Sequence, residues 1–315
     1  MNRVKIKAYA KINLTLEIVG ERDGFHLLNS VVASVDLFDL ITLKKRKDKL
    51  SFVTMKGQGS ESIPPEENNA LKAAERFSEL FGTNGAEITV YKNIPIGAGL
   101  GGSSADVAGV LNGMAKLYNV TDQTALERLA ETLGSDTKYM LSGGFQKMSG
   151  KGEELAPIST AATLHFLAIC PNSPVSAGGC YQQFDKLQIP LSNGEKTREL
   201  INLLQSNKPI NEGGRYLTND LYAPASLLNP DVEKAYQEAL SFSPLGAIMS
   251  GSGSCVLAWF ETRELCEWAK SRYRGKFKTF LLKTVIPSEE KRKLFKNPFA
   301  LSKEETDEIC ENNEN

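Results

Sequence analysis

The sequence lacks any long hydrophobic run, because no stretch approaches the roughly 18 consecutive apolar residues that a membrane-spanning helix needs. Residues 1–7 carry charges and have no apolar segment typical of a secretory signal peptide. Neither sign of charge is in excess, since 37 basic and 38 acidic residues leave a net charge of −1. We therefore expect no membrane partner and no nucleic-acid partner, and a specificity that resides in a local site.

Cysteines are few and never form a C-x-x-C pair, which argues against a zinc site and against a disulfide framework. All five lie in the second half of the chain, at Cys170, Cys180, Cys255, Cys266 and Cys310. An odd number without regular spacing is typical of free thiols in a reducing compartment. The pattern therefore predicts free cysteines and a cytoplasmic location.

Histidines are scarcer still, with only His26 and His165 in 315 residues. Neither belongs to the H-R-D element of a protein kinase, and no D-F-G element or G-x-x-x-x-G-K-[ST] run is present, so protein kinases and P-loop enzymes are both excluded. A dinucleotide-binding fold places a second strand and an acidic residue about 20 positions beyond its glycine loop. In this sequence the acidic residue at that distance is Asp122, which lies in a break before an expected helix and is not preceded by a strand pattern. The glycine run therefore does not fit a dinucleotide-binding fold.

Glycine and serine are concentrated in one run, Pro-Ile-Gly-Ala-Gly-Leu-Gly-Gly-Ser-Ser-Ala-Asp-Val-Ala at 95–108. Residues 86–94 alternate apolar and polar side chains, which predicts a strand, and the apolar residues at 107–118 recur at helical spacing. Glycines let backbone N–H groups approach an anion, and a helix start presents unpaired N–H donors and the positive end of its dipole. The run therefore predicts a phosphate-binding loop, with an ordinary glycine-rich connection as the alternative.

The strongest strand pattern lies at 4–18, where apolar and polar residues alternate without a break. Because side chains in a strand have a period of two, Lys11 and Asn13 lie on one face, one pleat apart. From the residues alone, they are more commonly solvated groups on an outer face. Asp136 follows the expected end of a helix at Gly134 and, taken alone, is expected to cap the next short helix.

Separated motifs of this sequence resemble those of the GHMP kinases, the superfamily of galactokinase, homoserine kinase, mevalonate kinase and phosphomevalonate kinase. The glycine run is similar to their phosphate loop. Tyr9-Ala10-Lys11-Ile12-Asn13-Leu14 and the segment 133–144 resemble the opening and catalytic-base motifs of one member family, the diphosphocytidyl-methylerythritol kinases. Residues 246–257 resemble the third GHMP motif, and the resemblance covers roughly residues 4–286 in the family's order.

The resemblance implies an α+β fold, the GHMP kinase fold, with two subdomains and the active site in the cleft between them. We expect an N-terminal subdomain with the phosphate loop at 1–155, a ferredoxin-like C-terminal subdomain at 156–287 and a charged tail at 288–315. The resemblance also implies ATP and Mg²⁺ as cofactors. The expected reaction is phosphorylation of the 2-hydroxyl of 4-diphosphocytidyl-2-C-methyl-D-erythritol, a step in non-mevalonate isoprenoid biosynthesis.

The family's functional positions fall on matching residues of this sequence. Asp136 matches the catalytic base, Lys11 the lysine beside it, and Asn13 the asparagine that contacts the substrate. The positions that hold the cytosine fall on Phe25, His26 and Tyr181. Tyr181 is expected at the end of a loop, and Phe25 and Tyr181 are expected to lie on either side of the base. Asn68 matches the asparagine near the nucleotide base and could equally cap a helix. The other ATP positions fall on the glycine run, at Pro95, Gly97, Ala98, Gly99, Leu100, Gly101, Gly102, Ser103 and Ser104. Ser104 is also a candidate Mg²⁺ ligand.

Two other interpretations stay open at this point. A GHMP kinase for homoserine or a mevalonate derivative would keep the loop and need no site for a cytosine. A non-catalytic paralogue that binds nucleotide is suggested by Lys138, where the family has proline, and by Ser103, where it has a third glycine. Both a monomer and a homodimer are compatible with the sequence.

Overall fold

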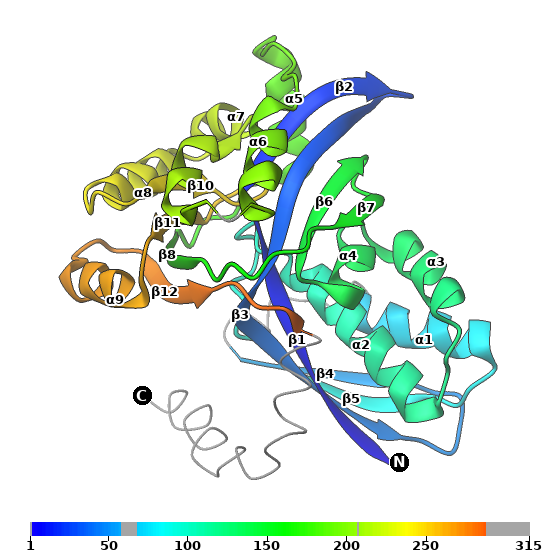
Figure 1. The fold of residues 1–315 in the computed structure, drawn as a ribbon. Helices are drawn as coiled ribbons and strands as arrows, with labels where there is room; N and C mark the ends of the chain where they lie inside the picture. The colour runs from blue at the N-terminus through cyan, green and yellow to red at the C-terminus, as the bar shows by residue number, and fades with distance from the viewer. Residues whose placement is uncertain (1, 58–67, 207, 288–315) are drawn as a thin grey trace.

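The computed structural model describes residues 2–57, 68–206 and 208–287. Within them, an eight-stranded sheet and a four-stranded sheet form the frame of the molecule (Figure 1). The larger sheet contains β1 (Arg3–Asn13), β2 (Thr15–Arg22), β3 (Phe25–Lys45), β4 (Phe52–Lys56), β5 (Ala86–Tyr91), β6 (Phe145–Gly150), β7 (Glu154–Pro157) and β9 (Thr218–Asn219). The smaller sheet has the order β10 (Gly246–Met249), β11 (Val256–Phe260), β8 (His165–Cys170) and β12 (Lys278–Lys283).

Helices cover both sheets, and the α+β class is confirmed. Those in the first half of the chain are α1 (Asn69–Phe81), α2 (Gly102–Tyr118), α3 (Gln123–Leu133) and α4 (Thr137–Ser142). Those in the second half are α5 (Ala177–Lys186), α6 (Glu195–Leu204), the 3₁₀ helix η3 (Ile210–Tyr216), α7 (Tyr222–Leu228), α8 (Pro230–Leu240) and α9 (Arg263–Arg272). Among the described residues, no helix has both the length and the apolar character needed to span a bilayer.

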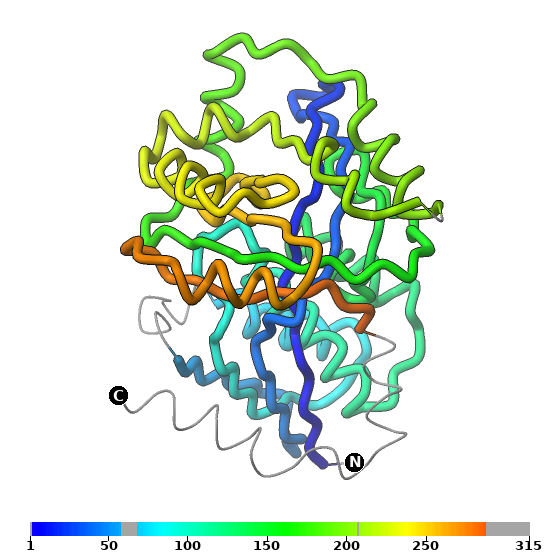
Figure 2. Tube along the Cα trace, turned by 60° about the vertical axis from the view of Figure 1, so that its left-hand side comes forward, coloured from blue at the N-terminus to red at the C-terminus, as the bar shows by residue number. Residues whose placement is uncertain are grey.

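The long strand β3 organises the larger sheet, since it pairs with β1, β2, β5 and β6. Its 21 residues form the backbone to which these four strands bond along different parts of its length. The continuous strand predicted at 4–18 is instead divided at Leu14 into β1 and β2. Figure 2 shows these first strands, in blue, running through the middle of the molecule from one end to the other.

Strand β8 is buried on both faces and joins two hydrophobic cores. Phe166 and Ala168 belong to the core shared with the larger sheet, whereas Leu167 and Ile169 belong to the core beneath the C-terminal helices. Such two-sided burial explains why the strand reads as a continuous apolar run rather than an alternating one. The core between the sheets is continuous, and the division into subdomains near residue 155 stays a prediction.

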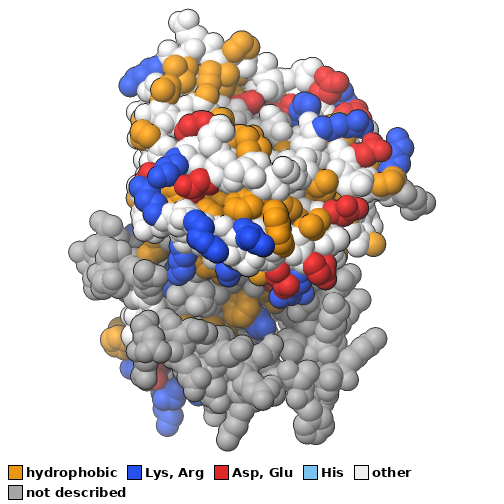
Figure 3. Space-filling view, turned by 90° about the vertical axis from the view of Figure 1, so that its left-hand side faces the viewer, with side chains coloured by type: hydrophobic (Ala, Val, Ile, Leu, Met, Phe, Trp, Pro, Cys, Tyr) orange, Lys and Arg blue, Asp and Glu red, His pale blue; other side chains and the backbone are white. Residues whose placement is uncertain are grey.

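Several helix boundaries follow the predicted signals. Asn68 caps α1 through its side-chain oxygen, which accepts from the N–H groups of Ala70 and Leu71. Asp122 caps α3 in the same way. On the face that carries α8 and α9, Figure 3 shows exposed hydrophobic, basic and acidic side chains interspersed, in line with the near-zero net charge.

The prediction of free cysteines is wrong for one pair. Cys170, at the end of β8, and Cys255, just before β11, form a disulfide with their Cα atoms 4.2 Å apart. The two residues are 85 positions apart in sequence, and the antiparallel register of β8 and β11 brings them together. Cys180 and Cys266 are free and buried, whereas Cys310 lies outside the described residues.

A buried ion-pair network holds the strand that enters the glycine run. The ammonium of Lys92 contacts the carboxylates of Asp39 on β3 and Asp106 on α2, the latter at 2.6 Å. Asp39 also accepts from the backbone N–H groups of Asn93 and Ile94, at 2.5 and 2.9 Å. One cation facing two buried carboxylates leaves an excess negative charge, and burial raises the pKa of Asp106 to about 8.

We expect this network to make the stability of the protein depend on pH. The pKa of Asp106 is above its ordinary value of 3.8, so the folded protein holds a proton that the unfolded chain releases. The free energy of unfolding should therefore fall as the pH rises from about 4 through about 8. Asp106→Asn keeps an oxygen acceptor for Lys92 and carries no titrating group, so the fall should be smaller in the variant by the contribution of Asp106, while Asp36 and Asp220, whose pKa values burial also raises, keep theirs.

Urea unfolding at a series of pH values checks this expectation. Asp48→Asn is the control, because Asp48 is exposed and its hydrogen bond from Arg46 lowers its pKa. That variant should keep the wild-type slope between about pH 6 and about pH 9. An identical slope in the Asp106→Asn variant would show that Asp106 does not hold the proton.

Candidate active site

The glycine run at 95–101 forms a loop between β5 and α2 in which three glycines have positive φ angles. A Cβ atom on Gly99, where φ is +75°, would lie 2.0 Å from the carbonyl oxygen of Ser250. A Cβ atom on Gly101, where φ is +72°, would lie 2.3 Å from the Met140 side chain. Gly99 therefore requires glycine for conformation and for space, whereas Gly101 requires it for conformation, because the methyl end of the Met140 side chain can move. No side chain caps α2, whose first turn presents its N–H groups next to this loop.

The hairpin between β10 and β11 is hydrogen-bonded to the glycine loop. The Ser250 hydroxyl donates to the carbonyl oxygen of Gly99 at 3.0 Å and accepts from the backbone N–H of Asn13 at 3.3 Å. Further along the hairpin, the N–H of Cys255 donates to the carbonyl oxygen of Ala98 at 3.1 Å. On its other side the loop contacts strand β1, where the backbone N–H of Lys11 donates to the carbonyl oxygen of Leu100 at 3.0 Å.

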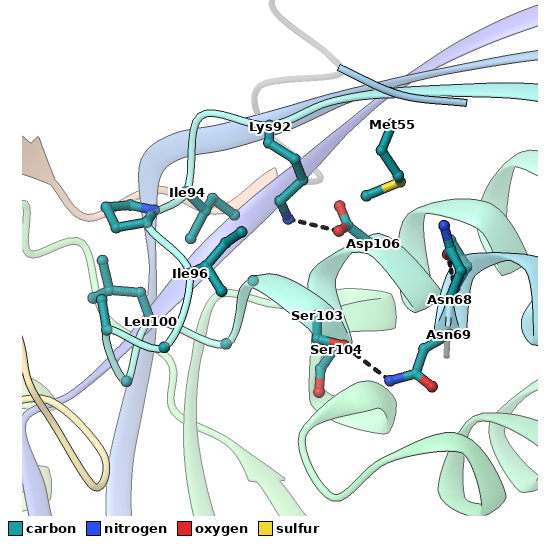
Figure 4. A pocket seen from close by; sticks show the side chains of 17 residues that line it. Met55, Asn68, Asn69, Lys92, Ile94, Ile96, Leu100, Ser103, Ser104 and Asp106 are labelled. Carbon is teal, nitrogen blue, oxygen red and sulfur yellow. Dashed lines mark hydrogen bonds and ion pairs between the residues drawn. The ribbon is translucent and has the colours of Figure 1, made fainter. Parts of the chain in front are cut away.

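A first cavity of about 340 Å³ lies on the α1 and α2 side of the loop (Figure 4). It is lined by every residue predicted to contact ATP: Asn68, Pro95, Gly97, Ala98, Gly99, Leu100, Gly101, Gly102, Ser103 and Ser104. Figure 4 shows Lys92 and Asp106 along one edge, and Asn69 directed at Ser103, whose hydroxyl oxygen accepts its amide at 3.1 Å. Glycine backbone, a free helix start and hydroxyl groups together suit the phosphates of a nucleotide.

The oxygen donors around Ser104 are of the kind that Mg²⁺ prefers. A Cβ atom on Gly134 would lie 3.5 Å from the Ser104 hydroxyl oxygen, so Ser104 is next to the turn that carries Asp136. The described residues contain no group of three or more acidic, histidine or cysteine side chains placed to hold a metal ion. Mg²⁺ in phosphoryl-transfer sites commonly takes only one or two protein ligands besides the phosphates, so the residues fit the ion.

Asp136 and Lys11 form an ion pair beside the loop. The ammonium of Lys11 lies 3.3 Å from the Asp136 carboxylate, and the Lys11 side chain is only 7% exposed. The interpretation of Lys11 as a solvated surface residue is therefore wrong. Asp136 makes no side-chain cap bond to α4, so the capping interpretation is also wrong, and its carboxylate remains 24% exposed.

Asn13 is fixed in one orientation next to this pair. Its side-chain oxygen accepts from the Lys11 ammonium at 2.7 Å, and its amide nitrogen donates to the Ser30 hydroxyl at 2.9 Å. The Ser30 hydroxyl donates in turn to the backbone oxygen of Thr15. This chain of buried hydrogen bonds sets the position of the Lys11 ammonium between Asn13 and Asp136.

A second cavity of about 530 Å³ opens on the other side of the loop. It is lined by every residue predicted to act in catalysis or to contact the acceptor: Lys11, Asn13, Phe25, His26, Asp136 and Tyr181. Gly99 and Gly101 line both cavities. The glycine loop is thus the wall where the two cavities meet, with the Asp136 carboxylate beside it.

The outer end of the second cavity differs in detail from the prediction. Tyr181 lies within α5 rather than at the end of a loop, because Ser176 caps a helix that starts at Ala177. His26 stacks on the Tyr181 ring, with centroids 5.1 Å apart and an interplanar angle of 21°, and the placement of Phe25 and Tyr181 on either side of a base stays a prediction. Burial raises the pKa of Tyr181, and the charge of Asp136 raises it further, so the phenol stays neutral.

Lys138 does not pair with Asp136, and its charge is directed elsewhere. Its ammonium lies 2.6 Å from the Glu131 carboxylate and 3.3 Å from the backbone oxygen of Glu153. Glu131 belongs to α3, which precedes the turn at Asp136. The substitution of proline by lysine at this position therefore places its charge in a surface ion pair.

Three structural features of the site escaped the sequence analysis. They are the Ser250 hydroxyl, the Lys92 network and the stacking of His26 on Tyr181. Each depends on segments far apart in the chain, and Ser250 and Asn13 are separated by 237 positions. The only local signal was the Gly-Ser-Gly-Ser turn at 251–254, which marks a hairpin but does not reveal what it packs against.

Comparison with known families agrees with this geometry. The chain belongs to the GHMP kinase family: residues 68–147 match the family's N-terminal domain and residues 192–277 match its C-terminal domain. It is 32% identical to a 4-diphosphocytidyl-2-C-methyl-D-erythritol kinase of Caldicellulosiruptor saccharolyticus over 90% of this chain and 97% of that protein. It is 34% identical to the kinase of the same name from Desulfitobacterium hafniense, over 86% and 94% of the two chains. The predicted resemblance is confirmed.

Solved structures agree on the fold. A crystal structure of 4-(cytidine 5'-diphospho)-2C-methyl-D-erythritol kinase matches with a TM-score of 0.72 and 26% identity, over 89% of this chain and 99% of the other. A homoserine kinase from Cytophaga hutchinsonii matches with a TM-score of 0.71 at 20% identity, over 91% and 95% of the two chains. The second likeness establishes the shared fold alone, and the chain is a GHMP family kinase.

We expect Gly99→Ala to abolish tight binding of ATP. A methyl group 2.0 Å from the Ser250 carbonyl oxygen must displace either the loop or the β10–β11 hairpin, and the positive φ adds strain. Isothermal titration calorimetry should find ATP affinity reduced by at least about 10-fold, which corresponds to about 1.4 kcal/mol.

Gly82→Ala provides the matched control for backbone strain. Gly82 also has a positive φ, +66°, but a Cβ atom there meets nothing within 4 Å. That variant should lose about 1–2 kcal/mol of unfolding free energy and keep its affinity for ATP. Equal ATP affinity in both variants would remove the close packing of Gly99 from the explanation.

Proposed function

We propose that this chain is an ATP-dependent kinase that phosphorylates the 2-hydroxyl of 4-diphosphocytidyl-2-C-methyl-D-erythritol. The observation that carries the proposal is the pair of cavities that meet at Gly99 and Gly101, with Asp136 beside the junction. A donor on one side and an acceptor on the other would face each other across that junction. The acceptor is proposed from the relatives described above, which are similar to this chain over nearly its whole length.

In this proposal the first cavity holds ATP. The N–H groups of the loop and of the first turn of α2 bind its phosphates, and the glycines let those phosphates come close to the backbone. Mg²⁺, held by Ser104 and the phosphates, would neutralise part of the charge on the triphosphate. Asn68 caps α1 through its oxygen, which leaves its amide nitrogen to face the nucleotide.

Asp136 acts as the general base in this proposal. Its carboxylate is partly exposed to the second cavity, where it can accept the proton of the acceptor hydroxyl. The Lys11 ammonium keeps that carboxylate ionised and offsets negative charge on the transferring phosphoryl group. Asn13 fixes the ammonium by its hydrogen bond and orients the erythritol part of the acceptor.

The outer end of the second cavity holds the cytosine in this proposal. The stacked rings of His26 and Tyr181 present aromatic surface to a base, and His26 is held by Asp185 at 2.7 Å. Phe25 is 56% exposed at the rim, where its ring is available to the base as well. An acceptor such as homoserine or mevalonate has no group that would use these rings.

Magnesium-dependent ADP formation by the purified protein tests the proposal. The acceptors to compare are 4-diphosphocytidyl-2-C-methyl-D-erythritol, homoserine and mevalonate. We expect turnover with the cytidyl acceptor alone. Turnover with another acceptor would assign a different GHMP kinase activity, and ATP binding without any turnover would assign a non-catalytic paralogue.

Asp136→Asn should reduce kcat by about 10²- to 10⁴-fold, because the amide cannot accept the hydroxyl proton. ATP affinity measured by calorimetry should be unchanged, since Asp136 does not line the first cavity. Asp122→Asn is the control, as it removes a carboxylate from outside both cavities while retaining the cap of α3. Near-normal turnover by the Asp136→Asn variant would remove this residue from the mechanism.

A further inference from the structure

Two buried hydroxyl groups, those of Ser34 on β3 and Tyr139 on α4, lie 3.1 Å apart and belong to neither cavity. The Tyr139 ring packs with Val32 and Met148 in a small core of its own. Burial raises the pKa of Tyr139, so its hydroxyl keeps its proton. Buried hydroxyls need hydrogen-bond partners, and a bonded pair of them is a directional contact between the elements that carry them.

The groups around this pair determine which hydroxyl donates and which accepts. The Tyr139 hydroxyl donates its proton to the backbone oxygen of Gly144 at 2.7 Å. The Ser34 hydroxyl therefore donates to the Tyr139 oxygen, and it accepts from the N–H of Gly144 at 3.0 Å. The N–H of Ser34 also donates to the backbone oxygen of Gly144, at 3.2 Å. Both hydroxyls are thus satisfied in one arrangement of α4 against β3.

Ser34 connects this cluster to the strand that carries Lys11. In the antiparallel register of β1 and β3, Lys11 lies directly opposite Ser34. Residues opposite each other in such a pair project to the same face of the sheet, with their Cβ atoms about 4.5–5.5 Å apart. The hydroxyl that bonds Tyr139 therefore projects beside the Lys11 side chain.

Tyr139 connects the same cluster to the turn that carries Asp136. Asp136 directly precedes α4, and its backbone oxygen accepts from the N–H of Met140 at 3.0 Å. At the other end of the helix, the N–H of Gly143 donates to the backbone oxygen of Tyr139 at 2.8 Å. Because α4 has only six residues, a displacement of Tyr139 displaces Asp136 with it.

We propose that Ser34 and Tyr139 are positioning residues whose hydroxyl pair sets the distance between the Lys11 ammonium and the Asp136 carboxylate. One hydroxyl is fixed beside Lys11 and the other to the helix that follows Asp136, so a buried connection spans the same gap as the 3.3 Å ion pair. The inference rests on the proposed function, in which that ion pair acts on the acceptor hydroxyl. Phosphoryl transfer depends on positioning, and a displacement of about 1 Å can reduce a rate about 100-fold.

Removal of either hydroxyl tests the proposal. Tyr139→Phe keeps the ring in its core, and kcat for magnesium-dependent phosphorylation of the diphosphocytidyl acceptor should fall by about 10- to 100-fold. The KM for ATP should be nearly unchanged, because neither residue lines the first cavity. Ser34→Ala should have the same effect, and the double variant should be no worse than either single variant, because the two hydroxyls act as one unit.

Tyr118→Phe is the matched control for the loss of a tyrosine hydroxyl. The Tyr118 hydroxyl donates to the backbone oxygen of Gly85 at 2.6 Å, and Tyr118 lines neither of the two cavities. This variant should keep the wild-type kcat. A loss of kcat equal to that of Tyr139→Phe would overturn the inference, because the position of the lost hydroxyl would then not matter.

The Asp136→Asn background separates positioning from general damage to the fold. If Tyr139 acts through Asp136, adding Tyr139→Phe to a protein that already lacks the base should change kcat little. The same fold-loss of kcat in the wild-type and Asp136→Asn backgrounds would overturn the inference, because it would show that the Tyr139 hydroxyl does not act through the carboxylate.

Crystal structures of the wild-type protein and the Tyr139→Phe variant in one crystal form test the geometry without any activity. The separation of the Lys11 ammonium and the Asp136 carboxylate should increase in the variant by about 1 Å. An unchanged separation, or an unchanged kcat, would overturn the inference and leave the kinase proposal intact. Absence of turnover by the wild-type protein with every acceptor would overturn the kinase proposal, and the measured separation would still decide whether the hydroxyl pair positions Asp136.

Discussion

The architecture of the site depends on one close approach, that of the glycine loop to the β10–β11 hairpin. The Gly99 backbone lies so near the Ser250 carbonyl oxygen that a single methyl group would fall 2.0 Å from it. This contact joins the C-terminal half of the chain to the N-terminal sheet at the point where the two cavities meet. Because the Ser250 hydroxyl also bonds the backbone of Asn13, the same residue sets the distance between the loop and the Lys11–Asp136 pair.

Electrostatics on the two sides of the loop are arranged differently. The first cavity is bordered by the Lys92 network, in which one buried ammonium lies between two carboxylates and a proton is retained on Asp106. The second cavity has the buried ammonium of Lys11 beside the partly exposed carboxylate of Asp136. Each cavity thus has a lysine ammonium at its edge, and each of these two ammonium groups is held next to at least one carboxylate group.

Local sequence patterns predicted several elements of the fold, whereas most of the candidate site residues came from the resemblance to a family. The glycine run between a strand and a helix and the helix cap at Asn68 follow from short-range rules, and both occur. Asp136 was different, because its immediate neighbours indicate a helix cap and only the resemblance to a family indicated a base. The sequence likewise did not determine whether the Lys11 side chain is solvated or buried, because its burial depends on the distant turn that carries Asp136.

The features that sequence could not supply all depend on tertiary contacts. The disulfide between Cys170 and Cys255 needs the register of two strands, and the stacking of His26 on Tyr181 needs α5 to begin at Ala177. Periodicity assigns a residue to a face of its own element and contains no information about which element packs there.

The central claim is that ATP and the acceptor bind on opposite sides of the glycine loop. The most direct test is a crystal structure of the protein with a non-hydrolysable ATP analogue and the cytidyl acceptor. We expect the triphosphate on the α2 side of the glycine loop, the cytidine against His26 and Tyr181, and the acceptor hydroxyl beside Asp136. Both ligands on the same side of Gly99 and Gly101, or an acceptor hydroxyl remote from Asp136, would contradict the arrangement described here.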